Sequence, residues 1–366
     1  MSQENSMKGV EQLDPNMRLA GPDGKEWQWV EPLNSLARVA GFPWLNHDRI
    51  YRRLPQHPKW SLRPAVDSLA NCTAGGQLHF ATNSPRLAVR VKLAAPASMY
   101  HMPSTGQCGF DCYLGEPGKQ RYLATTRYDH KLTEYESTLF DSEDASNKVV
   151  TLNFPLYQGV KEVLIGLEPG ASLSEPPAYE NQGKVIFYGT SITQGGCAAR
   201  PGMAFTNILS RRINREFINL GFSGNGKGEP ELAHLITEIT DPACYILDYD
   251  ANVASVQDMQ ETLPQFISIL RESFPETPIL VISRVPTARE YYDTAAREKR
   301  LGKLQVQRNT VQQLQSAGDA NISFLSGEEL MGDSYLESTV DGSHPTDLGF
   351  WLFANALEPE IKKLLG

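Results

Sequence analysis

The sequence predicts a two-part fold in which an antiparallel β-sandwich precedes an α/β domain with a parallel sheet. In the first half, short apolar runs alternate with polar residues between turn residues, a pattern typical of an antiparallel sandwich. In the second half, apolar runs of strand length alternate with amphipathic stretches of helix length, which indicates βαβ units. A stretch without an apolar pattern separates the halves. We therefore place residues 1–175 in the first part, 176–183 in a linker and 184–366 in the second part.

The first part contains several runs that have the pattern of β-strands. Residues 78–82, 87–94 and 150–157 alternate between apolar and polar side chains, and residues 163–167 form a compact apolar run. Glycine, proline, asparagine and aspartate punctuate these runs, which favours many short strands. We expect an antiparallel sandwich of jelly-roll type, with no helix of more than two turns.

The second part alternates strands and helices. Five apolar runs predict buried parallel strands, at 185–188, 217–220, 244–247, 279–283 and 322–325. Apolar residues at helical spacing predict helices that include 205–213, 232–239 and 263–270. Parallel sheets place ligands at the carboxyl ends of their strands, so functional side chains are expected just after each strand.

A serine stands directly after the first of these strands. Tyr188 is followed by Gly189, Thr190 and Ser191. Glycine allows a tight turn that presents the serine hydroxyl at the sheet edge, where backbone N–H groups of the next segment are available. Taken alone, this pattern also fits an ordinary serine that caps a helix.

Three further segments carry candidate functional residues. Gly224 lies in a glycine-rich loop after the second strand and can offer a backbone N–H to a developing oxyanion. Asn252 follows the third strand and is a suitable neutral donor, although asparagine also forms Asx turns. Near the C-terminus, Asp341 and His344 form a D-x-x-H segment before a helix. This spacing lets the aspartate accept a hydrogen bond from one imidazole nitrogen while the other faces the serine.

The identity and order of these residues resemble the SGNH, or GDSL-like, hydrolases across residues 184–366. The resemblance implies a three-layer α/β/α domain that is flavodoxin-like. It implies Ser191 as nucleophile, His344 as its base and Asp341 as the third member of a triad. It also implies an oxyanion hole formed by the backbone N–H groups of Ser191 and Gly224 and by Nδ2 of Asn252.

Two positions depart from the pattern of that family. Thr190 stands where the usual Gly-Asp-Ser motif has aspartate, and Ala251 precedes Asn252 where glycine is frequent. The first change is expected to alter support of the turn more than the chemistry. The second leaves the orientation of the Asn252 donor less well defined.

The first part carries its own short motif. The segment from Gly109 to Tyr113 reads G-F-D-C-Y and is similar to the G-x-D-L-Y signature of a β-sandwich that precedes SGNH domains in a group of bacterial esterases. Arg53-Leu-Pro55 and Ala74-Gly75 are also similar to that group. Its members resemble carbohydrate esterases, which implies removal of acetyl or other short acyl groups from sugars.

Composition excludes several other classes of protein. The net charge of −9 and the absence of a basic cluster argue against nucleic-acid or anionic-membrane partners. The five cysteines include no C-x-x-C pair, so we expect free thiols, no metal site and no cofactor. The first fifteen residues lack the apolar core of a signal peptide, which predicts a soluble, cytoplasmic protein, or a secreted or periplasmic one if the chain is a processed form.

The sequence therefore predicts a serine esterase that hydrolyses short-chain acyl esters, with carbohydrate esters as the expected substrates. Two alternatives stay open at this point. A sugar hydroxyl can replace water at the same site, which would make the protein an O-acyltransferase. A non-catalytic carbohydrate-binding protein on the same scaffold is the other alternative. The oligomeric state is not predicted.

Overall fold

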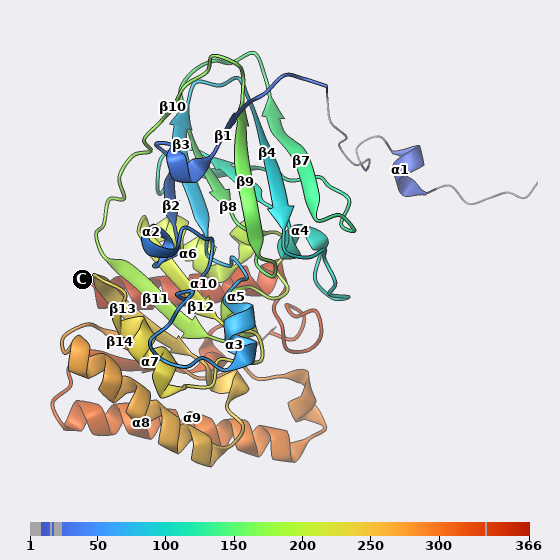
Figure 1. Cartoon of the computed structure of the whole chain (residues 1–366). Helices are drawn as coiled ribbons and strands as arrows, with labels where there is room; N and C mark the ends of the chain where they lie inside the picture. The colour runs from blue at the N-terminus through green and yellow to red at the C-terminus, as the bar shows by residue number, and fades with distance from the viewer. Residues whose placement is uncertain (1–8, 15–16, 18–23, 334) are drawn as a thin grey trace, which may run out of the picture.

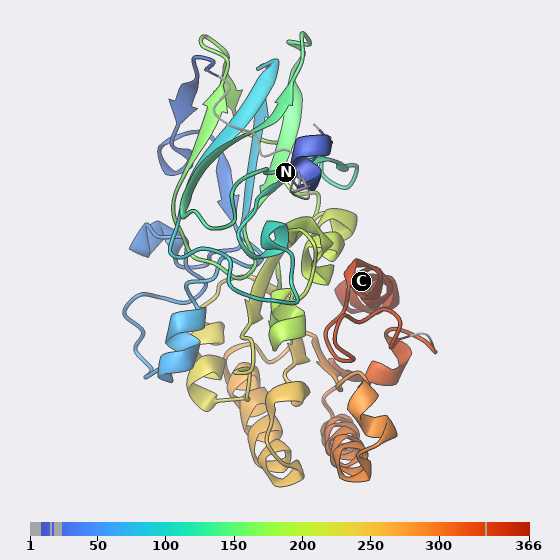
Figure 2. The same cartoon turned by 90° about the vertical axis from the view of Figure 1, so that its right-hand side faces the viewer.

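The computed structural model describes residues 9–14, 17, 24–333 and 335–366. Two antiparallel sheets form a sandwich, and a parallel sheet flanked by helices lies at one end of it (Figures 1 and 2). The predicted fold class is thus confirmed for both halves of the chain. Among the described residues, no helix combines the length and apolar character needed to cross a membrane.

The sandwich consists of two sheets whose inner faces enclose one core. The first sheet has the order β1-β9-β4-β7, with β1 at Gln28–Val30, β9 at Val160–Leu167, β4 at Arg86–Leu93 and β7 at Glu134–Asp141. The second has the order β10-β3-β8-β5-β6, with β2 paired to β3. Its strands are β10 (Leu173–Ser174), β3 (Gln77–Thr82), β8 (Lys148–Asn153), β5 (Asp111–Leu114), β6 (Arg121–Thr125) and β2 (Arg38–Ala40). Phe80, Val89, Leu152 and Ile165 are fully buried between the sheets.

The strand predicted for residues 150–157 ends earlier than expected. β8 stops at Asn153, and the backbone N–H groups of Phe154 and Leu156 bond to Gly76 and Gly106 instead of to a neighbouring strand. Pro155 between them has no N–H and cannot continue the ladder. The alternation of apolar residues beyond Asn153 was therefore a misleading signal.

The five predicted parallel strands form one sheet, and their order in it is β12-β11-β13-β14-β15. Their bounds are Glu216–Gly221 for β12, Lys184–Gly189 for β11, Pro242–Asp248 for β13, Ile279–Ile282 for β14 and Ile322–Leu325 for β15. Numbered along the chain, this is the order 2-1-3-4-5. The direction of strand addition reverses between β11 and β13, and such a switch point opens a crevice at the carboxyl ends of the strands.

Helices cover both faces of this sheet. The main helices are α5 (Ser191–Gln194), α6 (Phe205–Ile213), α7 (Pro230–Thr237), α8 (Val256–Ser273), α9 (Thr294–Ser316) and α10 (Asp347–Leu365). Short 3₁₀ turns are η2 (Pro32–Asn34), η3 (Pro201–Met203), η4 (Asp250–Asn252), η5 (Ala288–Tyr291) and η6 (Gly327–Glu329). Residues of α7, α8 and α9 share one core with the sheet, and residues of α6 and α10 share another on its opposite face. This is the three-layer arrangement that the resemblance implied.

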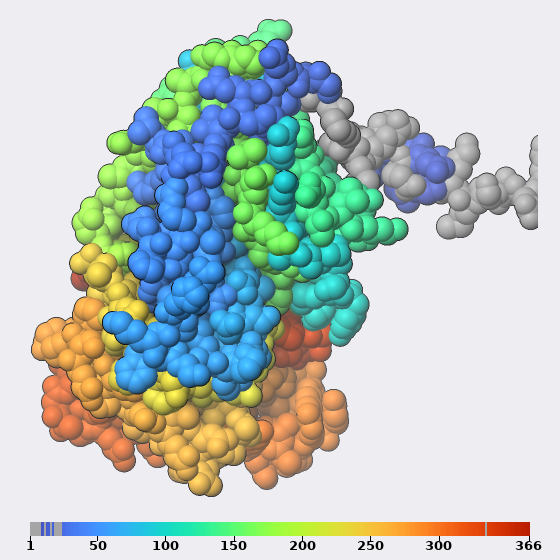
Figure 3. Space-filling view, viewed as in Figure 1, coloured from blue at the N-terminus to red at the C-terminus, as the bar shows by residue number. Residues whose placement is uncertain are grey.

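A segment of the N-terminal half packs against the α/β half. After β2 the chain runs through α2 (Leu45–Asp48) and α3 (Pro64–Leu69), and Figure 3 shows this blue stretch descending over the face of the molecule. Leu54, Val66 and Ala70 are buried in the core that contains Ile218 and Leu235. The domain boundary at residues 176–183 stays a prediction. The stretch after β2 precedes that boundary in the sequence, yet it contributes side chains to the core of the parallel sheet. The remaining short helices are α1 (Val10–Leu13) and α4 (Ser104–Gln107).

Candidate active site

Ser191, His344 and Asp341 form one hydrogen-bonded chain at the carboxyl edge of the parallel sheet. Ser191 begins α5 after β11, and its Oγ lies 2.9 Å from Nε2 of His344. Nδ1 of His344 lies 2.7 Å from Oδ2 of Asp341. A Cβ at Gly189 would stand 2.0 Å from Oγ1 of Thr193, which explains why the turn before Ser191 needs glycine. The fold thus brings together the three side chains that the sequence proposed as a triad.

Local hydrogen bonds fix the Asp341 carboxylate. Its Oδ1 accepts the backbone N–H groups of Ser343 at 3.0 Å and His344 at 2.7 Å, while Oδ2 accepts from the imidazole. Partial burial raises the pKa of Asp341, but the hydrogen bonds and charge of His344 outweigh burial and leave this pKa below its ordinary value. The carboxylate therefore stays charged in neutral solution and can stabilise a protonated imidazole.

The three predicted oxyanion donors have no hydrogen-bond partner within the described chain: the N–H groups of Ser191 and Gly224, and Nδ2 of Asn252. Gly224 has a φ of +68° and faces open space where a Cβ would stand. Oδ1 of Asn252 accepts the N–H of Gly226 at 3.2 Å, which fixes the amide plane and leaves Nδ2 on the other side. These are the groups expected of an oxyanion hole.

A buried aspartate supports the turn that departs from the family motif. The N–H of Thr190 donates to Oγ1 of Thr193 at 3.3 Å, and that hydroxyl donates to Oδ2 of Asp248 at 2.7 Å. Burial raises the pKa of Asp248 to about 7, and the nearby charge of Asp250 adds to the rise. Asp248 was visible in the sequence at the end of β13, but no spacing rule connected it to α5.

A buried ion pair anchors the loop that carries Asn252. Nζ of Lys303, on α9, lies 2.6 Å from Oδ1 of Asp250, and both side chains are at most 2% exposed. Oδ2 of Asp250 accepts hydrogen bonds from the backbone N–H of Arg284 at 2.8 Å and from Nε2 of Gln307 at 2.9 Å. Since Asp250 begins the turn η4 that ends at Asn252, these contacts position the candidate oxyanion donor.

A second buried cation anchors the loop that carries Gly224. Arg53 is fully buried, and its guanidinium donates to the backbone oxygens of Leu69 and Cys72 at 2.7 Å and of Asn219 at 3.2 Å, and also to that of Gly221. Burial lowers the pKa of Arg53 to about 10. The Arg-Leu-Pro segment noted in the sequence thus ties the N-terminal half to the end of β12.

The G-x-D-C-Y motif joins the sandwich to the loop after α5. Oδ2 of Asp111 accepts hydrogen bonds from Nη1 of Arg200 at 2.7 Å and from the N–H of Gly202 at 2.8 Å. The hydroxyl of Tyr113 also lies 2.6 Å from Nη1 of Arg200, and Asn153 donates to the other oxygen of Asp111 at 2.7 Å. The motif therefore has a docking role, which its position in the sequence alone did not reveal.

Two residues near the triad were not predicted from the sequence to belong to the site. His101 comes from the connection between β4 and α4, with its Nε2 3.8 Å from Oδ2 of Asp341 and its ring 5.7 Å from that of His344. Cys197, from the loop after α5, is buried and contributes with these two histidines to one cluster of metal-ligand atoms. A single histidine in a turn and a single cysteine carry no spacing signal, so only the fold reveals their proximity.

Comparisons with known families agree with the fold and the geometry. Residues 182–362 match the model of the GDSL-like lipase/acylhydrolase family, and residues 27–173 match GxDLY, the N-terminus of SGNH-hydrolase-type esterases. The chain therefore belongs to the GDSL-like (SGNH) hydrolases, in the group with this N-terminal domain. Comparison with curated proteins gave no significant match.

Several solved structures share this architecture along most of the chain. A protein from Bacteroides ovatus described as a GDSL-like lipase is 29% identical, with a TM-score of 0.85 over 93% of this chain and 98% of that one. A salicylyl-acyltransferase from a tetracycline biosynthetic pathway is 22% identical, with a TM-score of 0.74 over 92% and 97%. A family two carbohydrate esterase from Clostridium thermocellum, solved with cellohexaose, is 16% identical, with a TM-score of 0.57 over 80% and 93%.

Proposed function

We propose that this hydrolase is a serine esterase that removes short acyl groups, acetyl above all, from carbohydrate esters. The observation that carries the proposal is the unbroken chain of hydrogen bonds from Ser191 Oγ through His344 to Asp341. A hydroxyl, an imidazole and a carboxylate in this order form the constellation that activates a serine nucleophile.

The reaction proceeds in two acyl-transfer steps. Nε2 of His344 takes the proton of the Ser191 hydroxyl while Oγ bonds to the ester carbonyl carbon, and the carbonyl oxygen becomes an oxyanion. Donors from Ser191, Gly224 and Asn252 stabilise that charge. The C–O bond to the alcohol then breaks, and the alcohol oxygen leaves with the proton from His344. Water repeats the sequence on the acyl-serine and releases the carboxylic acid.

Two features support a small acyl group and a sugar. The loops at 190–195, 222–226, 248–253 and 341–346 contain mostly small and polar residues, whereas a long acyl chain needs a broad apolar groove. Exposed tyrosines lie on segments beside the triad: Tyr100 stacks on His101, and the loop of Tyr291 bonds to Gly342, the residue after Asp341, through the N–H of Ala288 at 2.9 Å. Tyrosine combines an apolar ring with a polar tip, which suits a sugar ring.

The first test removes the nucleophile. Ser191→Ala should lower turnover of acetylated sugars by about 10⁶-fold with an unchanged fold, as for other members of catalytic triads. Ser316→Ala, an exposed serine at the end of α9, is the matched control and should keep full activity. Substantial turnover by a folded Ser191→Ala protein would refute the assignment.

The second test measures the length of the acyl group. In a series of esters of one alcohol, kcat/KM should be highest for acetyl and fall steeply by butyryl, and an acetylated sugar should exceed a simple alkyl acetate. A preference for octanoyl esters would contradict the short-acyl proposal and leave the triad intact.

Acyl transfer to a second sugar is the alternative favoured by one observation, since a salicylyl-acyltransferase shares the fold over most of the chain. Product analysis with and without an acceptor sugar separates the two reactions. Free acetate formed at the same rate under both conditions would support hydrolysis. Binding of acetylated sugars without any product would instead support a non-catalytic binding protein.

A further inference from the structure

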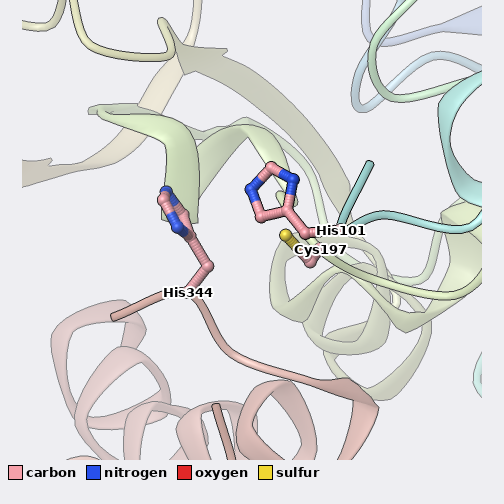
Figure 4. A group of neighbouring side chains, drawn as sticks. All are labelled: His101, Cys197 and His344. Carbon is pink, nitrogen blue, oxygen red and sulfur yellow. The ribbon is translucent and has the colours of Figure 1, made fainter. Parts of the chain in front are cut away.

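A cluster of metal-ligand atoms lies beside the triad. His101 from the sandwich, Cys197 from the loop after α5 and His344 each offer one ligand atom, and these atoms lie within 4.8 Å of one another. Figure 4 shows the two imidazole rings and the thiol gathered at this point. The three residues come from separate segments of the chain, so no C-x-x-C or similar spacing in the sequence indicates a metal site.

The donor set selects a particular class of cation. Two imidazole nitrogens and one sulfur suit Zn²⁺, Co²⁺ and copper, whereas Mg²⁺ and Ca²⁺ prefer oxygen. Zinc binds nitrogen at about 2.0–2.1 Å and thiolate sulfur at about 2.3 Å, so its tetrahedral ligands lie roughly 3–4 Å apart. The three ligand atoms of the cluster lie within 4.8 Å of one another, close to that spacing. Burial and the Asp341 carboxylate raise the pKa of Cys197 to about 12, so a bound cation must displace the thiol proton.

Two observations beyond proximity indicate that the cluster is suited to a cation. Nδ1 of His101 is buried and has no hydrogen-bond partner among the described residues, and buried polar atoms normally have one. The Asp341 carboxylate lies 2.7 Å from Nδ1 of His344 and 3.8 Å from Nε2 of His101. A carboxylate behind a histidine orients the ring and increases its basicity toward a metal.

We propose that His101, Cys197 and His344 bind Zn²⁺ or a similar thiophilic divalent cation, and that binding switches the triad off. Both nitrogens of His344 take part in the triad, one toward Ser191 and one toward Asp341. A cation on Nε2 occupies the lone pair that accepts the Ser191 proton. A cation on Nδ1 takes the place of the proton shared with Asp341, and the neutral imidazole then carries its proton on Nε2, which can no longer accept one from Ser191. In either case His344 can no longer act as base.

Cobalt(II) is the direct probe of this site. Titration of the reduced protein with Co²⁺ should give a saturable near-ultraviolet absorption band from thiolate coordination, and Zn²⁺ should displace it. Cys197→Ser should abolish the band, and His101→Ala should weaken Co²⁺ binding by at least about tenfold. Cys72→Ser and His57→Ala are the matched controls and should keep both the band and the affinity. Absence of a band in the folded protein, or its persistence in Cys197→Ser, would overturn the proposal.

The inhibition measurement rests on the proposed esterase function, whereas the cobalt band does not. Micromolar Zn²⁺ should lower kcat/KM at least about tenfold, with recovery on adding a chelator, because the base is sequestered. Each variant is compared with its own metal-free activity, and Cys197→Ser and His101→Ala should resist inhibition. Equal inhibition of both variants and the wild type would refute the switch. A protein that shows the band but no esterase activity would refute the proposed function and retain the metal site.

Discussion

The loops that carry Gly224 and Asn252 follow the strands on either side of β11, yet buried cations hold them in different ways. Arg53 reaches the Gly224 side from the N-terminal half and bonds only to neutral backbone oxygens. Lys303 pairs on the Asn252 side with the carboxylate of Asp250, in addition to donating to the backbone oxygens of Asp250 and Val253. When the cation is removed, neutral acceptors lose only their hydrogen bonds. A carboxylate that loses its cation is instead left as an unpaired charge in the protein interior. The two anchors are therefore expected to differ in their sensitivity to mutation.

The largest effect on stability is expected at the ion pair. Lys303→Met should lower the free energy of unfolding by about 3–5 kcal/mol, because it leaves Asp250 charged and buried without its partner. Denaturant unfolding measures the change. Asp250→Asn in the same chain keeps acceptor and donor atoms, so the double variant should regain part of the loss. A double variant that is less stable than Lys303→Met would show that the charge is not the cause.

The next largest effect is expected on turnover, at Asn252, the candidate oxyanion donor that this ion pair positions. Asn252→Ala should lower kcat by about 10²–10³ with little change in KM, since an oxyanion donor acts mainly in the transition state. Asn252→Asp keeps an oxygen that can accept the N–H of Gly226 but lacks the donor, and it should be at least as impaired. Full activity in Asn252→Asp would mean that Asn252 only supports the Gly226 loop.

Replacement of Arg53 should lower the free energy of unfolding by less than replacement of Lys303. Arg53→Met should lower the free energy of unfolding by about 1–3 kcal/mol, because hydrogen bonds to backbone oxygens are lost while no charge is left behind. Stability measured side by side with Lys303→Met tests the comparison directly. Equal losses in the two variants would remove the distinction between neutral and charged acceptors.

The smallest effect is a change in pH dependence at Asp248. Its pKa is raised to about 7 by burial, so the folded state holds this proton more tightly than the unfolded state. The resulting stability is full below the unfolded pKa near 4 and is lost as the pH rises toward 7. Asp248→Asn should flatten the dependence of unfolding free energy on pH over that window. An unchanged slope would show that Asp248 is ionised in the folded protein.

The sequence predicts the edge of the parallel sheet better than the rest of the molecule, for a physical reason. Residues that follow buried parallel strands meet at one edge because of the topology itself, so Ser191, Gly224 and Asn252 could be grouped before the structure was known. Asp341 and His344 interact over three residues, which a turn can bridge. Each of these relations is either local or fixed by the order of strands.

Other parts depend on packing that no periodicity encodes. The helix α9 was not predicted because its buried face includes Arg300, Lys303 and Gln307, which interrupt the apolar pattern that identifies a helix. The strands β1, β2 and β10 have at most three residues each, too few to show alternation. His101 reaches the triad only because the sandwich docks on the α/β half, and the residues around His101 carry no pattern that marks this contact.

The Arg53 anchor also constrains how the protein is made. A ribosome completes Arg53 long before it adds Asn219 and Gly221, whose backbone oxygens share the guanidinium with those of Leu69 and Cys72. Until β12 has left the exit tunnel, the nascent N-terminal half must keep this charge hydrated, and α3 must wait for the core that receives Val66 and Ala70. The Arg53 guanidinium can therefore gain its full set of partners only once the polypeptide has grown past the second strand of the parallel sheet.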